Sequence, residues 1–94
     1  MANGRLDKFK AVVTGGSDGI GLAIATAFAS EAAVLWLIAR DGDKLAAVAE
    51  DLRANGATVN CTSADLTDPA AIQQVHAEIT RSWDSVDVLV NNAG

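Results

Sequence analysis

Short apolar segments alternate along the chain with longer segments of helical periodicity. Val12 and Val13, and the run at 34–39, are continuously apolar rather than alternating, which is typical of strands covered on both faces of a parallel sheet. The pattern predicts four strands, at residues 9–14, 34–39, 58–63 and 86–91.

Three amphipathic helices are predicted between these strands. The first covers about 19–32. The second starts near Asp41 to Lys44, where an aspartate is a good cap, and stops at Asn55-Gly56, and the third begins at Pro69 behind the cap residue Asp68. The rows expected to face inward are Ile20, Ile24, Ala27 and Phe28 in the first helix, Leu45, Val48 and Leu52 in the second, and Ile72, Val75, Ile79 and Trp83 in the third.

The alternation of strands and helices predicts one α/β domain over residues 1–94. Short connections favour right-handed crossovers and a Rossmann-like parallel sheet in strand order 3-2-1-4, a truncated form of the doubly wound fold. The first two helices then cover one face and the third lies on the other. The carboxyl ends of the first and fourth strands flank the point where the winding reverses, which is where such folds bind ligands.

Charge and hydropathy narrow the classes of partner. The net charge is −5 and the seven basic residues are scattered, which disfavours nucleic acid binding. The longest apolar run, at 32–39, is too short to span a bilayer, and the first residues lack the apolar core of a signal peptide. A cytoplasmic protein without membrane contact is therefore expected.

Few residues suggest metal or redox chemistry. Cys61 is the single cysteine, which excludes an internal disulfide and a cysteine zinc site, and it is expected to be a small hydrophobe in a buried strand. His76, Trp36 and Trp83 are interpreted as structural, and Asp51 and Arg53 as part of a solvated helix face. No metal site is predicted.

The stretch from Val12 to Gly21 is a strand, a glycine-rich turn and a helix start. Such a turn favours an anion, because the first helical N–H groups lack internal partners and the helix dipole adds positive charge there. Gly15 can leave the strand at an unusual φ, Gly19 can admit a close ligand, and Gly21 can let the helix lie against the strand. A phosphate or pyrophosphate fits this position.

Three motifs resemble those of the classical short-chain dehydrogenase/reductase family. They are Thr14-Gly15-x-x-x-Gly19-Ile20-Gly21, Asp65-Leu66 and Asn91-Asn92-Ala93-Gly94. The resemblance implies an oxidoreductase that transfers a hydride between a nicotinamide cofactor and a carbonyl or alcohol substrate. The residues that it implies for cofactor binding are Gly15, Ser17, Asp18, Gly19, Ile20, Gly21, Arg40, Asp65, Leu66, Asn91, Ala93 and Gly94.

Arg40 bears on the choice of cofactor. Ala39 stands where NAD-preferring members of the family place an aspartate, and the arginine that follows suits a 2′-phosphate, so NADP is favoured over NAD. Asp18 weakens this preference, because its charge opposes a nearby phosphate. Asp41 could itself turn to a ribose hydroxyl, and Arg40 could be a solvated surface residue.

Alternatives also remain for other motif residues. The resemblance implies that Asp65 accepts from the adenine amino group, but this aspartate could instead brace the turn at Thr67-Asp68. Asn91 can bind the ribose side of the cofactor and also tie its strand to the sheet. Ser17 can bond a phosphate oxygen or stabilise the turn, and Thr14 is expected to bond within the junction of strand and turn.

Members of this family carry a catalytic serine, a Tyr-x-x-x-Lys pair and a further asparagine beyond the Asn-Asn-Ala-Gly motif. This sequence contains no tyrosine, so no catalytic residue is assigned and these 94 residues alone are expected to be inactive. The missing strands and helices are expected to leave apolar surface around the third helix and a tendency to form homo-oligomers. The alternative is a non-catalytic nucleotide-binding or assembly module on the same fold.

Overall fold

The computed structural model describes residues 9–15 and 19–91. The elements in chain order are β1 (Lys10–Thr14), α1 (Gly19–Ser30), β2 (Val34–Ala39), α2 (Gly42–Ala54), β3 (Thr58–Ser63), α3 (Pro69–Ser82) and β4 (Val88–Asn91). The predicted succession of strands and helices is confirmed. Within the described ranges, no helix is both long and apolar enough to cross a membrane.

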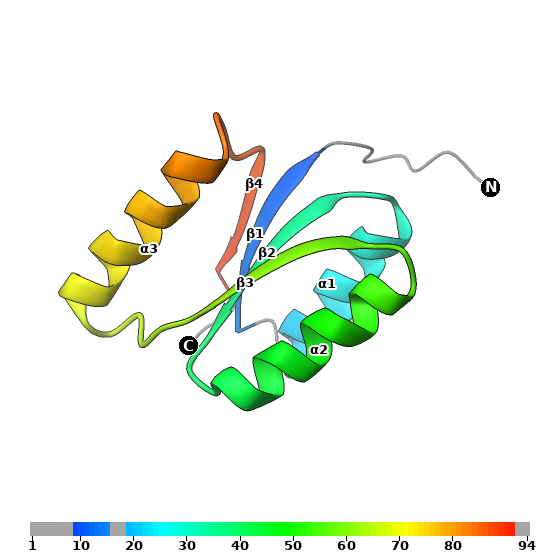
Figure 1. The fold of residues 1–94 in the computed structure, drawn as a ribbon, viewed down its shortest axis with the longest axis horizontal. Coiled ribbons are helices and arrows are strands. Elements are labelled where there is room, and N and C mark those ends of the chain that lie inside the picture. The colour runs from blue at the N-terminus through cyan, green and yellow to red at the C-terminus, as the bar shows by residue number, and fades with distance from the viewer. Residues whose placement is uncertain (1–8, 16–18, 92–94) are drawn as a thin grey trace.

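The four strands form one parallel sheet in the predicted order, β3-β2-β1-β4. In the centre, Val12 of β1 is level with Trp36 of β2 on one side and with Leu89 of β4 on the other. Helices α1 and α2 lie on one side of the sheet and α3 lies on the other (Figure 1), as predicted.

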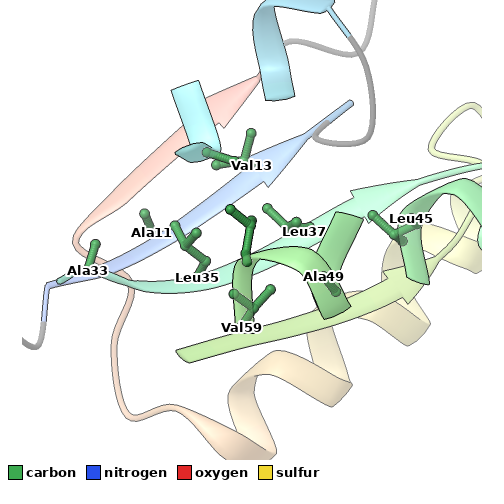
Figure 2. Packing of buried hydrophobic residues seen from close by; sticks show 10 residues of the cluster. Ala11, Val13, Ala33, Leu35, Leu37, Leu45, Ala49 and Val59 are labelled. Atoms are coloured by element: carbon green, nitrogen blue, oxygen red, sulfur yellow. The ribbon is translucent and has the colours of Figure 1, made fainter. Parts of the chain in front are cut away.

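The larger core fills the space between the sheet and helices α1 and α2. Because side chains alternate along a strand, Ala11 and Val13 point into this layer while Val12 points to the opposite face. Figure 2 shows the cluster, which consists of Ala11, Val13, Ala25, Ala33, Leu35, Leu37, Leu45, Ala49, Leu52 and Val59.

A smaller core joins α3 to the other face of the sheet. Its buried members are Val12, Trp36, Ile38, Val75, Ile79 and Trp83. The two indole rings meet edge to face, with centroids 5.2 Å apart and an interplanar angle of 86°. Trp36 Nε1–H donates to Thr62 Oγ1 at 2.9 Å, and the Thr62 hydroxyl donates to Glu78 Oε1 at 2.9 Å. This chain of hydrogen bonds connects β2, β3 and α3.

The predicted helix caps are present. Asp41 precedes α2 and accepts from the Lys44 N–H at 3.1 Å, while Asp68 accepts from the Ala70 N–H at 3.0 Å, with Pro69 opening α3. Helix α2 stops at the predicted Asn55-Gly56, where Gly56 has a φ of +95°.

Helix α1 ends at Ser30, two residues before the predicted end at Ala32. Ala32 has a left-handed φ of +65°, and the Ala33 N–H donates to the Phe28 carbonyl at 3.1 Å. The Ala57 N–H makes the corresponding bond to the Leu52 carbonyl at 3.0 Å, after Gly56. Both helices therefore end in the same reverse turn, but α1 places an alanine where α2 has a glycine.

Two of the predicted inward rows are partly wrong. Ile20 is 70% exposed and Ala27 is exposed as well, whereas the buried residues of α1 are Gly21 and Ala25. Small residues face the sheet because they let α1 approach it closely, which displaces the larger side chains outward.

In α3, Val75 and Ile79 are buried as predicted, but Ile72 is 47% exposed. Trp83 is buried although it lies just beyond the helix, at its C-cap. The inward row of α3 is therefore shorter than the periodicity predicted.

The starts of two strands and the burial of Cys61 also differ from expectation. β1 begins at Lys10 rather than residue 9, and β4 at Val88 rather than Val86, after Asp87 exchanges hydrogen bonds with Lys10. Cys61 is half-buried rather than buried.

Arg53 is not simply solvated, because its guanidinium donates to the Val59 carbonyl from Nε at 2.9 Å and from Nη2 at 2.5 Å. β3 is one of the two outer strands of the sheet in the described residues. The Ala64 N–H points to β2, where it donates to the Ala39 carbonyl, so by alternation the Val59 carbonyl points away from β2. Arg53 thus binds an acceptor on the open edge of the sheet.

Candidate functional site

Four sequence-predicted site residues lie at one edge of the sheet. Gly15 follows β1, Arg40 follows β2, Asp65 comes two residues after β3, and Asn91 ends β4. Since the strands are parallel, their carboxyl ends meet at the same edge (Figure 1), as the topology predicted.

The described part of the glycine-rich turn has the backbone conformations that only glycine adopts without strain. Gly15 has a φ of +69° and donates its N–H to the Ile38 carbonyl at 2.7 Å, which holds the start of the turn against β2. Gly19 has a φ of +52°, and a Cβ there would meet no heavy atom of the described residues within 4 Å. Gly19 is therefore required for its conformation, and the space beside it is open.

Helix α1 starts at this turn with its N-terminus at the carboxyl edge of the sheet. Gly21 is buried, as expected for close packing of helix and strand, and Ile20 is exposed at the start of the helix. Ser17 and Asp18 of the predicted site, and Ala93 and Gly94 at its other end, lie outside the described residues.

Thr14 joins the two strands at the reversal of the winding. It is buried, and its hydroxyl lies 3.3 Å from the Val90 carbonyl oxygen and 3.2 Å from Asn91 Oδ1. Both contacts reach across to β4. The expected bond of Thr14 within the junction of strand and turn stays a prediction, because residues 16–18 lie outside the described residues. The expectation that Asn91 ties its strand to the sheet is confirmed.

Arg40 is exposed, and its backbone is held at the end of β2. The Ser63 hydroxyl donates to the Arg40 carbonyl at 2.9 Å, and a Cβ at Gly42 would lie 3.3 Å from Ser63 Oγ. The carboxylate of Asp41 is engaged by the Lys44 N–H as a helix cap. Arg40 therefore places a positive charge directly after the end of β2.

Asp65 braces the turn before α3. Its Oδ1 accepts from the Thr67 N–H at 3.0 Å and from the Thr67 hydroxyl at 2.6 Å. These bonds, the hydroxyl's first, lower the pKa of the Asp65 carboxyl below its ordinary value of 3.8, and the positive charge of Arg40 acts in the same direction. The carboxylate is consequently ionised at neutral pH and can only accept hydrogen bonds.

An apolar groove of about 730 Å³ adjoins this edge, between α3 and the face of β1 and β4. Leu66 is half-buried and lines the groove together with Thr14 and Asn91. Leu89 on the floor is 64% exposed. The expectation of exposed apolar surface around the third helix is therefore confirmed.

Two hydroxyl residues of the site make contacts that the sequence did not predict. Ser63 was only the end of a strand, and Thr67 only part of a turn, yet their hydroxyls bond the Arg40 carbonyl and the Asp65 carboxylate. The available signal was their position at the carboxyl end of β3, where Ser63 is the last residue of the strand and Thr67 lies in the turn that follows. In the described part of the chain, no three His, Cys, Asp or Glu side chains are grouped so that they could hold a metal ion.

Comparison with known proteins agrees with this geometry. Residues 10–94 match the family described as short chain dehydrogenase. The 1-deoxy-11-beta-hydroxypentalenate dehydrogenase of Streptomyces avermitilis is 43% identical over 84 residues, which are 89% of this chain and 31% of that protein.

Solved structures with the same fold include cofactor complexes. The L-sorbose reductase of Gluconobacter frateurii, complexed with NADPH and L-sorbose, has a TM-score of 0.91 at 38% identity over 99% of this chain and 36% of its own. A metagenomic short-chain oxidoreductase in complex with NADP has a TM-score of 0.88 at 41% identity over 94% of this chain and 40% of its own. The chain spans 31% to 34% of the length of similar curated proteins.

Proposed function

Because the chain belongs to the short-chain dehydrogenase family, we propose that it is the cofactor-binding part of an oxidoreductase that uses NADP, with NAD as the weaker ligand. The observation that carries the choice of cofactor is the exposed Arg40 directly after β2, with Ala39 in place of an acidic residue. A guanidinium can bind a 2′-phosphate through two parallel hydrogen bonds.

The described residues fit a dinucleotide. The open space beside Gly19 and the N-terminus of α1 suit the pyrophosphate, which Gly15, Ile20 and Gly21 would border together with Ser17 and Asp18. Asp65 and Leu66 would hold the adenine ring. Asn91, Ala93 and Gly94 would contact the ribose side.

When bound, the cofactor would supply the redox chemistry: NADPH donates a hydride to a carbonyl carbon, and NADP⁺ accepts one from an alcohol carbon. The part of the protein described here would hold and orient that cofactor. The Thr14 hydroxyl fixes Asn91 at the end of β4, and Ser63 fixes the backbone of Arg40 at the end of β2. No catalytic residue is assigned to this chain.

Calorimetric titration of the protein, at the length that its gene encodes, with NADPH and separately with NADH tests the proposal. We expect NADPH to bind more tightly, and Arg40→Ala to weaken NADPH binding by about 10- to 100-fold, as for loss of charge-assisted hydrogen bonds. NADH binding should change little.

Arg81→Ala is the matched control, because Arg81 is an exposed arginine in the last turn of α3, away from the strand ends. It should leave both affinities unchanged. Equal loss of NADPH and NADH affinity in Arg40→Ala would contradict the choice of NADP, and absence of binding by the folded wild-type protein would contradict the cofactor site itself.

A further inference from the structure

The Asp65 carboxylate has a fixed orientation although the residue is exposed. An exposed aspartate ordinarily samples several rotamers, but here the N–H and the hydroxyl of Thr67 both converge on Oδ1, at 3.0 Å and 2.6 Å. Two donors on one oxygen restrict both side-chain torsions. Within residues 9–15 and 19–91, Oδ2 of Asp65 has no hydrogen-bond donor, so this second oxygen is held in place with its lone pairs available.

The backbone of Asp65 is held on both sides. The preceding residue, Ala64, donates its N–H to the Ala39 carbonyl at 2.9 Å, which continues the pairing of β2 and β3 beyond Ser63. The Asp65 carbonyl accepts from the Asp68 N–H at 3.1 Å. The carboxylate is therefore positioned relative to the end of β2, where Arg40 lies.

We propose that Thr67 is a positioning residue that orients the Asp65 carboxylate so that Oδ2 accepts a hydrogen bond from the 6-amino group of adenine. This inference rests on the proposed function, because it needs a dinucleotide at the strand ends. An ionised carboxylate only accepts hydrogen bonds, so it selects a purine with an amino group at position 6 and disfavours one with a carbonyl oxygen there.

Thr67 favours ligand binding because it orders the Asp65 side chain before the ligand arrives. A freely rotating carboxylate loses rotamer freedom when a ligand orders it, and that loss weakens binding. With Oδ1 already held by Thr67, the bond from the adenine amino group forms without ordering the side chain again. The hydroxyl of Thr67 thus acts on the purine through Asp65 and not by touching it.

The probes for the test are NADPH and its analogue in which hypoxanthine replaces adenine. The two differ at the purine, where the amino group at position 6 becomes a carbonyl and the neighbouring N1 gains a hydrogen, so their ratio of dissociation constants reports on the groups that face this edge of the ring. Because both titrate the same folded molecules, the ratio is insensitive to a partial loss of folded protein. For the wild type we expect a preference for NADPH of about tenfold or more, the size of one hydrogen bond to a charged group.

Thr67→Val removes the hydroxyl and keeps the shape of the side chain. We expect this ratio to fall to about threefold, because one of the two bonds that orient Asp65 is lost while the backbone N–H remains. Thr67→Ser should restore the wild-type ratio. Thr80→Val is the matched control, since the Thr80 hydroxyl donates to the His76 carbonyl near the opposite end of α3.

Titration of the Asp65 carboxyl by NMR in the absence of cofactor accompanies the binding data. Its pKa should rise in Thr67→Val and return in Thr67→Ser, because the Thr67 hydroxyl is the main cause of the lowered value. Should Thr67→Val fold poorly, Thr67→Ala removes the same hydroxyl and gives the same ratio test.

The outcomes separate this inference from the proposed function. A wild-type ratio retained in Thr67→Val, with the Asp65 pKa raised, would overturn the positioning role while the cofactor site stands. A wild-type protein that binds both cofactors equally would show that Asp65 does not read the amino group, which also overturns it. Failure of the wild type to bind NADPH would instead reject the proposed function.

Discussion

The hydroxyl of Thr14 lies 3.2 Å from Asn91 Oδ1, which joins the last residues of β1 and β4. The two residues are also level in the ladder of the sheet. A side-chain bond therefore reinforces the backbone pairing at the point where the winding of the sheet reverses.

Removing this hydroxyl should weaken the sheet. We expect Thr14→Val to lower the free energy of unfolding by about 1 kcal/mol, because the buried bond to β4 is lost and the valine keeps the volume. Thr14→Ser, which retains the hydroxyl, should restore most of that loss in urea unfolding. Equal stability of the valine variant and the wild type would contradict a structural role for the bond.

A substitution at Ala32, just after α1, should raise the stability of the protein. Ala32 has a φ of +65°, a conformation that strains a side chain but not glycine, so Ala32→Gly should stabilise the protein by about 0.5 to 1 kcal/mol. Thermal and urea unfolding measure the change. The reciprocal variant, Gly56→Ala at a φ of +95°, should destabilise by about 1 kcal/mol, and a gain there would refute the argument.

The hydrogen bonds from Trp36 through Thr62 to Glu78 predict a larger effect. Thr62→Val removes the acceptor of the indole N–H and the donor to the carboxylate, so we expect a loss of about 1 to 3 kcal/mol in the free energy of unfolding. Near-ultraviolet circular dichroism should also change, since Trp36 packs edge to face on Trp83.

The control for Thr62→Val is Thr58→Val, which makes the same change at an exposed position at the start of the same strand. It should alter stability little. If both variants lose the same free energy, the effect belongs to the strand and not to the chain of hydrogen bonds.

The lowered pKa of Asp65 predicts that the free energy of unfolding decreases at acidic pH. Its pKa is lower in the folded protein than the ordinary 3.8, so folding favours the ionised form. This contribution is complete above the unfolded pKa and is lost as the pH falls through the folded pKa. Urea unfolding from about pH 5 to about pH 2 should show a smaller loss of stability for Asp65→Asn than for the wild type. A steeper loss in the variant would reverse the assigned sign.

The topology could be predicted because it depends on features that are local in sequence. Continuous apolar runs, Asp68-Pro69 and Asn55-Gly56 each indicate an element or its boundary without reference to distant residues. The inward row of α1 could not be predicted in the same way. There the close approach of helix and sheet selects Gly21 and Ala25, and hydrophobic periodicity weights the larger Ile20 instead.

In the site, too, local features could be predicted and contacts between distant residues could not. Strand ends place Gly15, Arg40 and Asn91 at one edge, which the parallel direction of the predicted strands is enough to predict. The bond from Ser63 to the Arg40 carbonyl depends on side-chain directions across 23 positions of sequence, and no local pattern encodes it. The same holds for the bond that Thr14 makes to β4.

The contact between Arg53 and the Val59 carbonyl has a consequence for how molecules of this protein meet. An open sheet edge offers its outward carbonyl and N–H groups to any extended chain that arrives, and such pairing is a route to fibrils. Since the guanidinium already occupies this acceptor, a strand from a second molecule must displace a charged donor before it can add to β3. Arg53 of α2 thereby protects the outer strand β3 against intermolecular β-pairing.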